Sequence, residues 1–211
     1  MDNKFMKYIM LALLWAMGWQ VGRCQNVKLQ MGDLVFQSID CGPLCDAINQ
    51  VTKGYKGYNF NHMGMVVIKN NDTLVLEASG KEVKLTPYKT FALKTQKPMY
   101  VGRLKKRFRY LIPKAVAFGL EQLGVPYDDD YLYNNGKYYC SELIYDCFLS
   151  AHGKPLFKLR PMTYKTPGSN TYFKVWEDYF KQLNLEVPEG KPGCNPGGIS
   201  RSKKIKILGS V

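Results

Sequence analysis

The chain has 211 residues, of which 45% are hydrophobic and 13% aromatic, and its 30 Lys and Arg outnumber its 17 Asp and Glu. This apolar and aromatic content excludes a disordered tail or a low-complexity scaffold, and it suffices for one sizeable hydrophobic core. We therefore expect a single folded domain.

The N-terminal segment has the pattern of a secretory signal. Lys4 and Lys7 precede an apolar run from Tyr8 to Trp19. The run is shorter than the roughly 20 residues that a membrane-spanning helix needs, but it fits the middle of a signal peptide. An N-terminal core helix would not account for a basic start followed by an unbroken apolar run. We predict that residues 1–24 are a cleaved signal peptide.

The predicted cleavage site follows Cys24. Gly22 and Cys24 are small and stand at the two positions that a signal peptidase reads, so the mature chain would begin at Gln25 or close to it. A lipoprotein signal with an acylated Cys24 is the alternative, but Arg23 stands where that signal requires a small residue. Cleavage would leave residues 25–211 as one domain with a net charge of +11, exported to the periplasm or cell envelope or secreted.

Positive charge in the remaining chain is clustered. No second apolar run approaches the length of a membrane span, so we do not expect a transmembrane protein after cleavage. In an exported protein, basic clusters more often mark a solvated face or a contact with an anionic cell-envelope polymer than a nucleic-acid interface, and zinc-finger spacing and RNA-binding signatures are absent from the sequence. The clusters are Lys105, Lys106, Arg107 and Arg109, and Arg201, Lys203, Lys204 and Lys206.

Cleavage would leave five cysteines, which cannot all pair within one chain. They are Cys41, Cys45, Cys140, Cys147 and Cys194. If four of them form disulfides, three pairings are possible, and all three stay open. Cys41 and Cys45 alone make a poor metal site, because two thiolates do not complete a tetrahedral shell and the histidines are not spaced to help. We expect neither a metal nor an organic cofactor.

The first half of the chain predicts strands around one helix. A short strand over residues 32–37 precedes a helix over 41–52, where apolar residues recur at helical spacing. Two β-rich runs, 62–68 and 73–78, flank an Asn/Asp turn and indicate a hairpin. Further strands are expected at 83–85 and 99–104.

The second half is predominantly helical. Pro113 and Gly124 bracket one predicted helix, and Gly153 terminates a second that begins near Cys140. A third helix is expected over 172–183, and the tail from Val187 is rich in Pro, Gly and Lys. Strands with helices grouped around them indicate an α+β domain.

Two histidines limit which cysteine could act as an activated nucleophile. His152 lies twelve residues after Cys140 on the same predicted helix, roughly 18 Å along its axis, so the two cannot share a proton. His62 is therefore the imidazole available to a thiol. Cys140 stands at a helix start, where unpaired N–H groups and the helix dipole favour a thiolate, whereas Cys147 lies two turns further in, on the apolar stripe. The alternative for Cys140 is a small hydrophobe on a buried helix face.

Strand geometry suggests a carboxylate that could orient His62. With a two- or four-residue turn, paired residues in the hairpin sum to 141, and Glu77 lies opposite Gly64 and diagonal to His62 on the same face. Such a carboxylate would fix the imidazole tautomer and stabilise the imidazolium. A three-residue turn would instead leave Glu77 facing solvent. Asn61 and Ser79 are weaker substitutes.

Five ordered segments carry a family resemblance. They are Gly32-Asp33-Leu-Val-Phe-Gln37, Asn61-His62-Met-Gly64, Leu76-Glu77-Ala78, Gly124-Val-Pro-Tyr-Asp128 and Tyr138-Tyr-Cys140-Ser-Glu-Leu. Together, with the histidine first and the nucleophile last, they resemble the circularly permuted, papain-like thiol hydrolases related to NlpC, in the YiiX-like branch. The resemblance runs from about Gly32 to Ser150, so the Cys41–Cys45 segment and the tail after Leu156 lie outside its motifs.

The resemblance implies a permuted papain-like α+β domain, with a small antiparallel sheet or partial barrel packed against helices. It implies Cys140 as nucleophile, His62 as base and Glu77 as orienting residue, with the Cys140 N–H as one oxyanion donor. Tyr138 or Tyr139 would border the site. The family acts on amide or ester bonds, some in cell-wall peptides and some in lipids.

We therefore expect an exported hydrolase that works through a thioester intermediate on a peptide or acyl-lipid substrate. Two alternatives stay open at this point. The same fold could serve as a non-catalytic module that binds peptidoglycan fragments or lipid, or the thioester could be resolved by an amine or alcohol, which would make the protein an acyltransferase.

Overall fold

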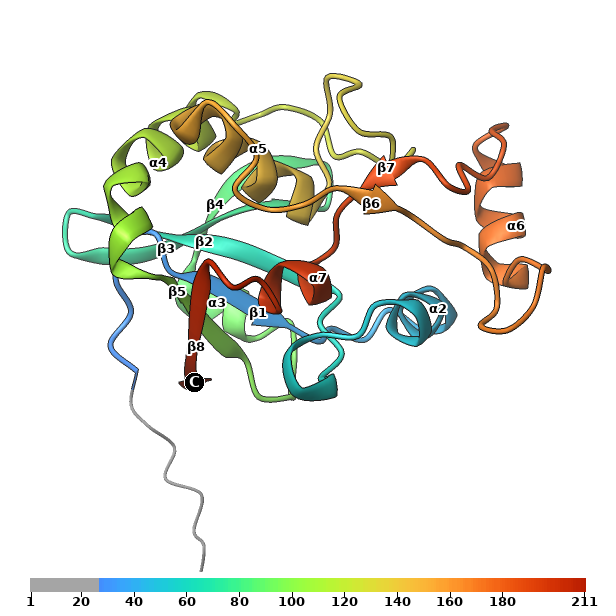
Figure 1. Ribbon diagram of the computed structural model, residues 1–211, viewed down its shortest axis with the longest axis horizontal. Helices are drawn as coiled ribbons and strands as arrows, with labels where there is room; N and C mark the ends of the chain where they lie inside the picture. The colour runs from blue at the N-terminus through green and yellow to red at the C-terminus, as the bar shows by residue number, and fades with distance from the viewer. Residues whose placement is uncertain (1–26) are drawn as a thin grey trace, which may run out of the picture.

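A six-stranded antiparallel sheet forms the centre of the computed structural model, which describes residues 27–211. Its strand order is β4-β3-β2-β1-β5-β8, so β4 and β8 are the two outermost strands and the sheet does not close into a barrel (Figure 1). Helices pack on the sheet, which confirms the predicted α+β class. The predicted signal peptide, residues 1–24, lies outside the described residues.

Strands β1 to β5 follow the predicted runs closely, whereas β8 and the short pair β6 and β7 were not predicted. Their bounds are β1 Leu34–Gln37, β2 His62–Lys69, β3 Asp72–Ser79, β4 Glu82–Pro87, β5 Tyr100–Leu104 and β8 Ile205–Ser210, with β6 Arg160–Pro161 paired to β7 Pro192–Gly193.

The three predicted helices of the second half are present within about two residues of their expected bounds. The α-helices are α2 Pro43–Val51, α3 Tyr88–Ala92, α4 Ile112–Glu121, α5 Cys140–His152, α6 Lys174–Gln182 and α7 Pro196–Ser200, with 3₁₀ turns η1 Tyr55–Gly57 and η2 Lys106–Leu111. Within residues 27–211, no helix combines the length and the apolar character needed to cross a membrane.

The β2–β3 hairpin has the register that places Glu77 near His62. Met65 pairs with Leu76 and Val66 with Val75, as the two-residue turn requires. Asn70 and Asn71 both have positive φ, 50° and 66°, which is the signature of a type I′ turn and suits asparagine better than most residues. The predicted register is therefore confirmed.

The sheet separates two hydrophobic clusters. Alternate residues of the central strands, such as Phe36 and Met65, pack under α4 and α5. The residues between them, such as Val66 and Val75, pack on the other face against Phe91 of α3. Period-two alternation thus gives the sheet two buried faces, and α4–α5 and α3 cover them from opposite sides (Figure 1).

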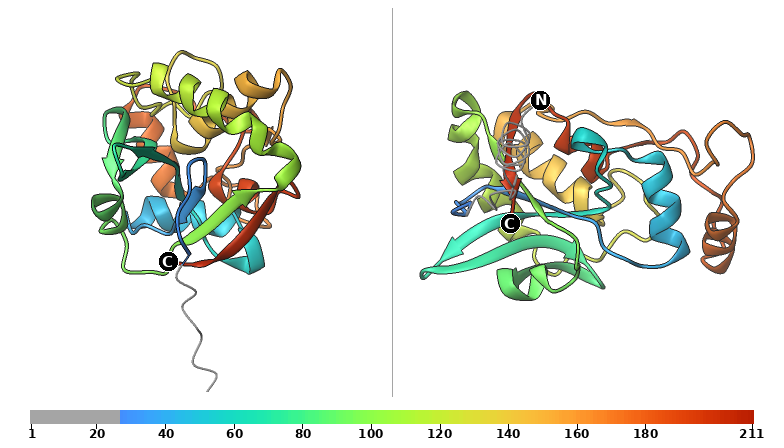
Figure 2. Two further views of the ribbon diagram at one scale, coloured as in Figure 1. Left: turned by 90° about the vertical axis from the view of Figure 1, so that its left-hand side faces the viewer. Right: turned by 90° about the horizontal axis from the view of Figure 1, so that it is seen from below.

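A third cluster lies beyond the end of the sheet, where α2 and α6 are side by side. Ala47 of α2 packs with Trp176 and Phe180 of α6 and with Tyr164. Figure 2 shows the same two helices from below, extending away from the sheet. These two helices and the chain around them form a small lobe attached to the main core.

The basic C-terminal tail is an integral part of the fold. Asn195 accepts a hydrogen bond from the N–H of Gly198 at 2.6 Å and caps α7, and β8 pairs with β5 to complete the sheet. Sequence periodicity did not predict β8, although Ile205 and Ile207 alternate with lysines in the pattern of a half-exposed edge strand.

We predict that Gly64→Ala destabilises the protein by about 1–3 kcal/mol, because a Cβ there would overlap the buried Val75 side chain and approach the Leu76 carbonyl oxygen to 2.8 Å. Urea denaturation measures the free energy of unfolding. Lys69→Ala, on the exposed end of the same strand, is the control and should change it by no more than about 0.5 kcal/mol. Equal stability of Gly64→Ala and the parent would show that the close packing is not needed.

Candidate active site

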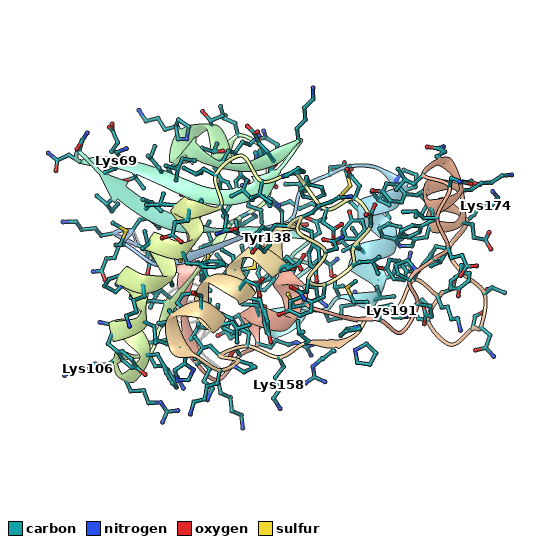
Figure 3. The ribbon with its side chains drawn as sticks, turned by 90° about the horizontal axis from the view of Figure 1, so that it is seen from above. Lys69, Lys106, Tyr138, Lys158, Lys174 and Lys191 are labelled. Carbon is teal, nitrogen blue, oxygen red and sulfur yellow. A yellow bond between two sulfur atoms is a disulfide. The ribbon has the colours of Figure 1, made fainter. Side chains whose placement is uncertain are left out.

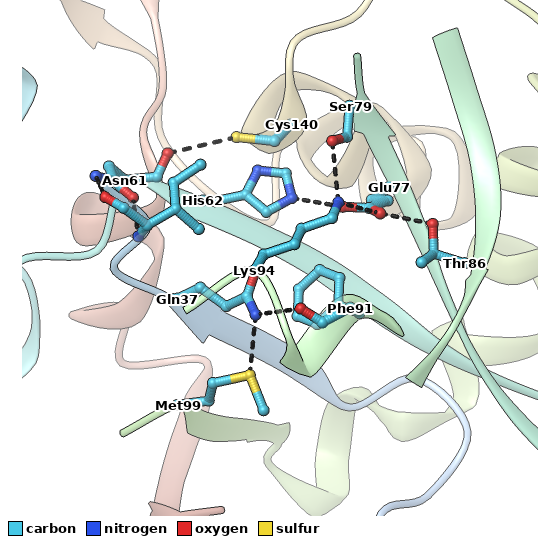
Figure 4. A network of polar contacts seen from close by, with 11 residues as sticks. Gln37, Asn61, His62, Glu77, Ser79, Thr86, Phe91, Lys94, Met99 and Cys140 are labelled. Carbon is cyan, nitrogen blue, oxygen red and sulfur yellow. Dashed lines mark hydrogen bonds and ion pairs between the residues drawn. The ribbon is translucent and has the colours of Figure 1, made fainter. Parts of the chain in front are cut away.

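Three elements bring the predicted site residues together at one end of the sheet. His62 is the first residue of β2, Glu77 lies near the end of β3, and Cys140 is the first residue of α5. Figure 4 shows the imidazole ring between the sulfur of Cys140 and the carboxylate of Glu77. Asn61, a weaker candidate for the residue that orients His62, has another role. Its side-chain amide accepts a hydrogen bond from the N–H of Ile39 and donates one to the carbonyl of Ile39.

Glu77 is fully buried, and both of its oxygens accept hydrogen bonds. Oε2 lies 2.5 Å from Nε2 of His62. Oε1 accepts from the hydroxyl of Thr86 on β4 and from Nζ of Lys94, each at 2.6 Å. Lys94 also donates to the Ser79 hydroxyl at 3.0 Å, so Ser79 supports the lysine and does not contact the ring in place of Glu77.

The ionisation of the pair is set by these contacts. Burial disfavours the charged form of Glu77, but the hydrogen bond and charge of His62, with the bonds from Lys94 and Thr86, lower its pKa to about 2. Burial also disfavours a charged His62, but hydrogen bonds and charge from Cys140 and Glu77 outweigh it and raise the pKa of His62 to about 9. The imidazole is therefore protonated at neutral pH.

The first turn of α5 supplies the rest of the electrostatic setting. Tyr139 has extended backbone, and the helix begins directly at Cys140, whose N–H has no acceptor within the helix. The sulfur lies 4.0 Å from the carbonyl oxygen of Asn61. Burial raises the pKa of Glu142, in the same turn, to about 8, so this carboxyl is neutral at pH 7 and adds no negative charge near the sulfur.

Two of the remaining cysteines form a disulfide, and two are buried thiols. Cys41 and Cys45 are bonded across the first turn of α2. Cys147 and Cys194 are free, and burial raises the pKa of both thiols. The described part of the chain therefore contains one disulfide, between Cys41 and Cys45, and its other three cysteines are free thiols.

The sulfur of Cys140 opens into a cavity of about 380 Å³ that sequence reasoning did not predict. Tyr139 lines this cavity, whereas Tyr138 is directed toward Asp146, which settles which of the two tyrosines borders the site. The walls come from α2, the loop before α5, α6 and the segment before α7. Segments far apart in the sequence meet to form this cavity, so a local sequence pattern cannot predict it. The density of tyrosines between residues 127 and 139 was the feature of the sequence that pointed to it.

Comparisons of the sequence and the fold show which known proteins this chain resembles. A model of the permuted papain-like amidase enzyme family, YaeF/YiiX, C92, matches residues 28–208. The uncharacterized protein YiiX of Escherichia coli (strain K12) is 29% identical over 191 residues, which cover 88% of this chain and 87% of that protein. The crystal structure of metalloprotein yiiX from Escherichia coli O157:H7 has a TM-score of 0.72 at 21% identity and covers 88% of this chain and 99% of that chain.

That crystal structure is described as one of a metalloprotein. Among residues 27–211 of this chain, no three His, Cys, Asp or Glu side chains lie close enough together to hold a metal ion.

We predict that His62 titrates with a midpoint of about 9, because Cys140 and Glu77 stabilise its protonated ring. NMR titration of the imidazole resonances measures this value, and His152→Gln removes the signal of the other histidine and assigns the resonance. Glu77→Gln should lower the midpoint, since it removes the carboxylate charge. A midpoint at or below 6.5 in the parent protein would contradict the arrangement described here.

The same shift predicts how stability depends on pH. Because the folded-state pKa of His62 lies above its unfolded value, its stabilising contribution is complete below pH 6.5 and is lost as the pH rises to about 9. In Cys140→Ala, where no thiol proton offsets that of His62, the free energy of unfolding should therefore fall as the pH rises above 6.5, and adding Glu77→Gln should make the fall smaller. Urea denaturation at a series of pH values measures both.

Proposed function

This chain belongs to the permuted papain-like amidase family YaeF/YiiX, C92, and we propose that it is a cysteine hydrolase that cleaves an amide or ester bond of a cell-wall peptide or a lipid-linked acyl substrate. In this proposal Cys140 is the nucleophile, His62 the base and acid, and Glu77 the orienting carboxylate. The observation that carries it is the position of the His62 ring between Cys140 and the buried Glu77, 2.5 Å from the carboxylate. The family match also confirms the predicted fold and its YiiX-like branch.

The acylation step follows from the charges of the site. The thiolate of Cys140 attacks the acyl carbon, and the developing oxyanion lies near the N–H at the start of α5, where the helix dipole stabilises negative charge. The protonated His62 then gives its proton to the leaving nitrogen or oxygen. The products of this step are a thioester on Cys140 and a free amine or alcohol.

Water resolves the thioester in the second step. The now neutral His62 removes a proton from a water molecule, and the hydroxide attacks the thioester carbonyl. The tetrahedral species collapses to release a carboxylic acid, and the sulfur and imidazole return to the ion pair. Glu77 stays ionised throughout, because Thr86 and Lys94 hold its second oxygen while His62 changes its protonation.

We predict that Cys140→Ala and His62→Ala each reduce hydrolysis of p-nitrophenyl acetate by about 10³-fold or more, with the circular dichroism spectrum unchanged. Iodoacetamide should alkylate Cys140 ahead of Cys147 and Cys194, because the thiolate is the reactive form and the other thiols are buried without an imidazole partner. Peptide mass mapping identifies the labelled residue.

Cys147→Ala is the matched control and should leave the alkylation of Cys140 unchanged. Release of free acetate, measured directly, distinguishes hydrolysis from acyl transfer. Equal labelling of all three thiols would count against the proposed nucleophile.

We also propose that residues 1–24 direct export of the protein and are then cleaved off. The basic start and apolar run support this, and so does the Cys41–Cys45 disulfide, because disulfides persist mainly in oxidising compartments outside the cytosol. An anionic cell-envelope polymer is a fitting partner there for the basic clusters of the chain.

We predict that the protein recovered from the cell envelope or medium begins at Gln25, as read by mass spectrometry of its N-terminal peptide. Leu13→Arg interrupts the apolar run and should keep the full-length chain in the cytosol. A mature chain that begins with an acylated Cys24 would support the lipoprotein alternative, and an intact chain from Met1 would contradict cleavage.

A further inference from the structure

The cavity beside Cys140 has an apolar wall on each side. Leu44, Ile48 and Val51 of α2 form one wall, and Trp176 and Tyr179 of α6 face them across the lobe. Its volume of about 380 Å³ lies within the range of small-molecule sites. The disulfide at the start of α2 also lines the cavity and ties the first turn of that helix, which makes this wall rigid.

Lysine and arginine are absent from this lining, all of which lies within the described part of the chain. Its charged groups in the proposed mechanism are Asp129 and the pair of His62 and Cys140, and the imidazolium of that pair is already matched by the sulfur and by Glu77. Stem peptides of cell walls carry carboxylates, which need cationic partners when they are taken out of water. The cavity therefore suits an uncharged group better than it suits such a peptide.

Two tyrosine hydroxyls of the lining are engaged within the protein. Tyr139 accepts a backbone N–H at 3.1 Å, and Tyr179 donates to a backbone carbonyl at 3.0 Å. The hydroxyl of Tyr164 is buried without a partner in the described residues. What these rings offer a ligand is mainly their apolar surface.

Cationic side chains lie on the other side of one cavity wall. Pro161, Met162, Cys194 and Asn195 border the cavity and also a neighbouring surface hollow. That hollow is lined by cations, and Lys158 extends outward from it (Figure 3). The five cations are Lys158, Arg160, Arg201, Lys203 and Lys204. Lysine and arginine side chains thus lie outside this wall of the cavity and do not line its interior.

From these observations we infer that the cavity binds the aliphatic chain of an acyl amide or ester and places the acyl carbonyl at Cys140. The inference rests on the proposed function and narrows its substrate to a long-chain acyl group. In the covalent step, the bond between the acyl carbon and its nitrogen or oxygen breaks as the carbon–sulfur bond forms, and the chain remains in the cavity as the thioester.

Chain length in a series of p-nitrophenyl esters tests the inference. From acetyl to decanoyl, kcat/KM should rise about tenfold for every two methylenes until the cavity is filled, after subtraction of the rate of Cys140→Ala. A flat series, or a preference for acetyl, would overturn the inference.

A bulky residue in the cavity should reverse this preference. Ile48→Trp fills the α2 wall and should lower the decanoyl-to-acetyl ratio of kcat/KM at least about tenfold. Leu183→Trp, an exposed position at the end of α6 outside the cavity, is the matched control and should keep the parent ratio. An unchanged ratio in a folded Ile48→Trp protein would contradict the assignment.

Binding to the parent protein gives a result that depends neither on turnover nor on the folding of a variant. 1-Decanol, an uncharged probe, should protect Cys140 from iodoacetamide, and ethanol at the same concentration should not. Protection without hydrolysis of any ester would support the acyl cavity and refute the proposed hydrolase. Cys140-dependent hydrolysis of acetyl ester without protection or chain-length dependence would support the hydrolase and refute the acyl cavity.

Discussion

The buried carboxylate of Glu77 is the constraint around which the site is arranged. A carboxylate without exposure stays ionised only where donors replace its water, and here those donors come from three separate elements. His62 reaches it from β2, Thr86 from β4, and Lys94 from the loop after α3. The His62 ring cannot turn away without leaving a buried charge uncompensated, so the carboxylate fixes both the position and the protonation of the imidazole.

Part of this arrangement could be predicted from sequence because it depends on local residues. Two asparagines at a two-residue turn set the hairpin register, and that register places Glu77 beside His62. The same alternation extends to Thr86, which pairs with Val75 and therefore faces the side of the sheet that carries Glu77, although the predicted strand stopped one residue short of it. The position of Lys94 could not be predicted in this way. It follows α3, whose five residues are too few to show a helical pattern of apolar side chains.

The cavity and the C-terminal strand depended on long-range packing and could not be read from local pattern. The cavity walls come from α2, the loop before α5, and α6, which are separated by most of the chain. The charged groups and the apolar surface of the site therefore come from two different regions of the molecule. The end of the sheet holds the ionised groups in a hydrogen-bonded network, and the lobe of α2 and α6 provides apolar surface. Cys140 lies where these two regions meet, since its sulfur faces both the imidazole and the cavity.

Exposure alone does not explain why one thiol of the three would be reactive. Cys140 and Cys194 are 5% and 6% exposed, and both line the cavity. What distinguishes Cys140 is its setting: it begins a helix, it lies beside a protonated imidazole, and the neighbouring Glu142 is neutral. Cys194 instead lies next to the hydroxyl of Tyr139, and burial stabilises its thiol form. Two sulfurs in one cavity thus have different surroundings, because the imidazole of His62 lies beside Cys140 and the hydroxyl of Tyr139 lies beside Cys194.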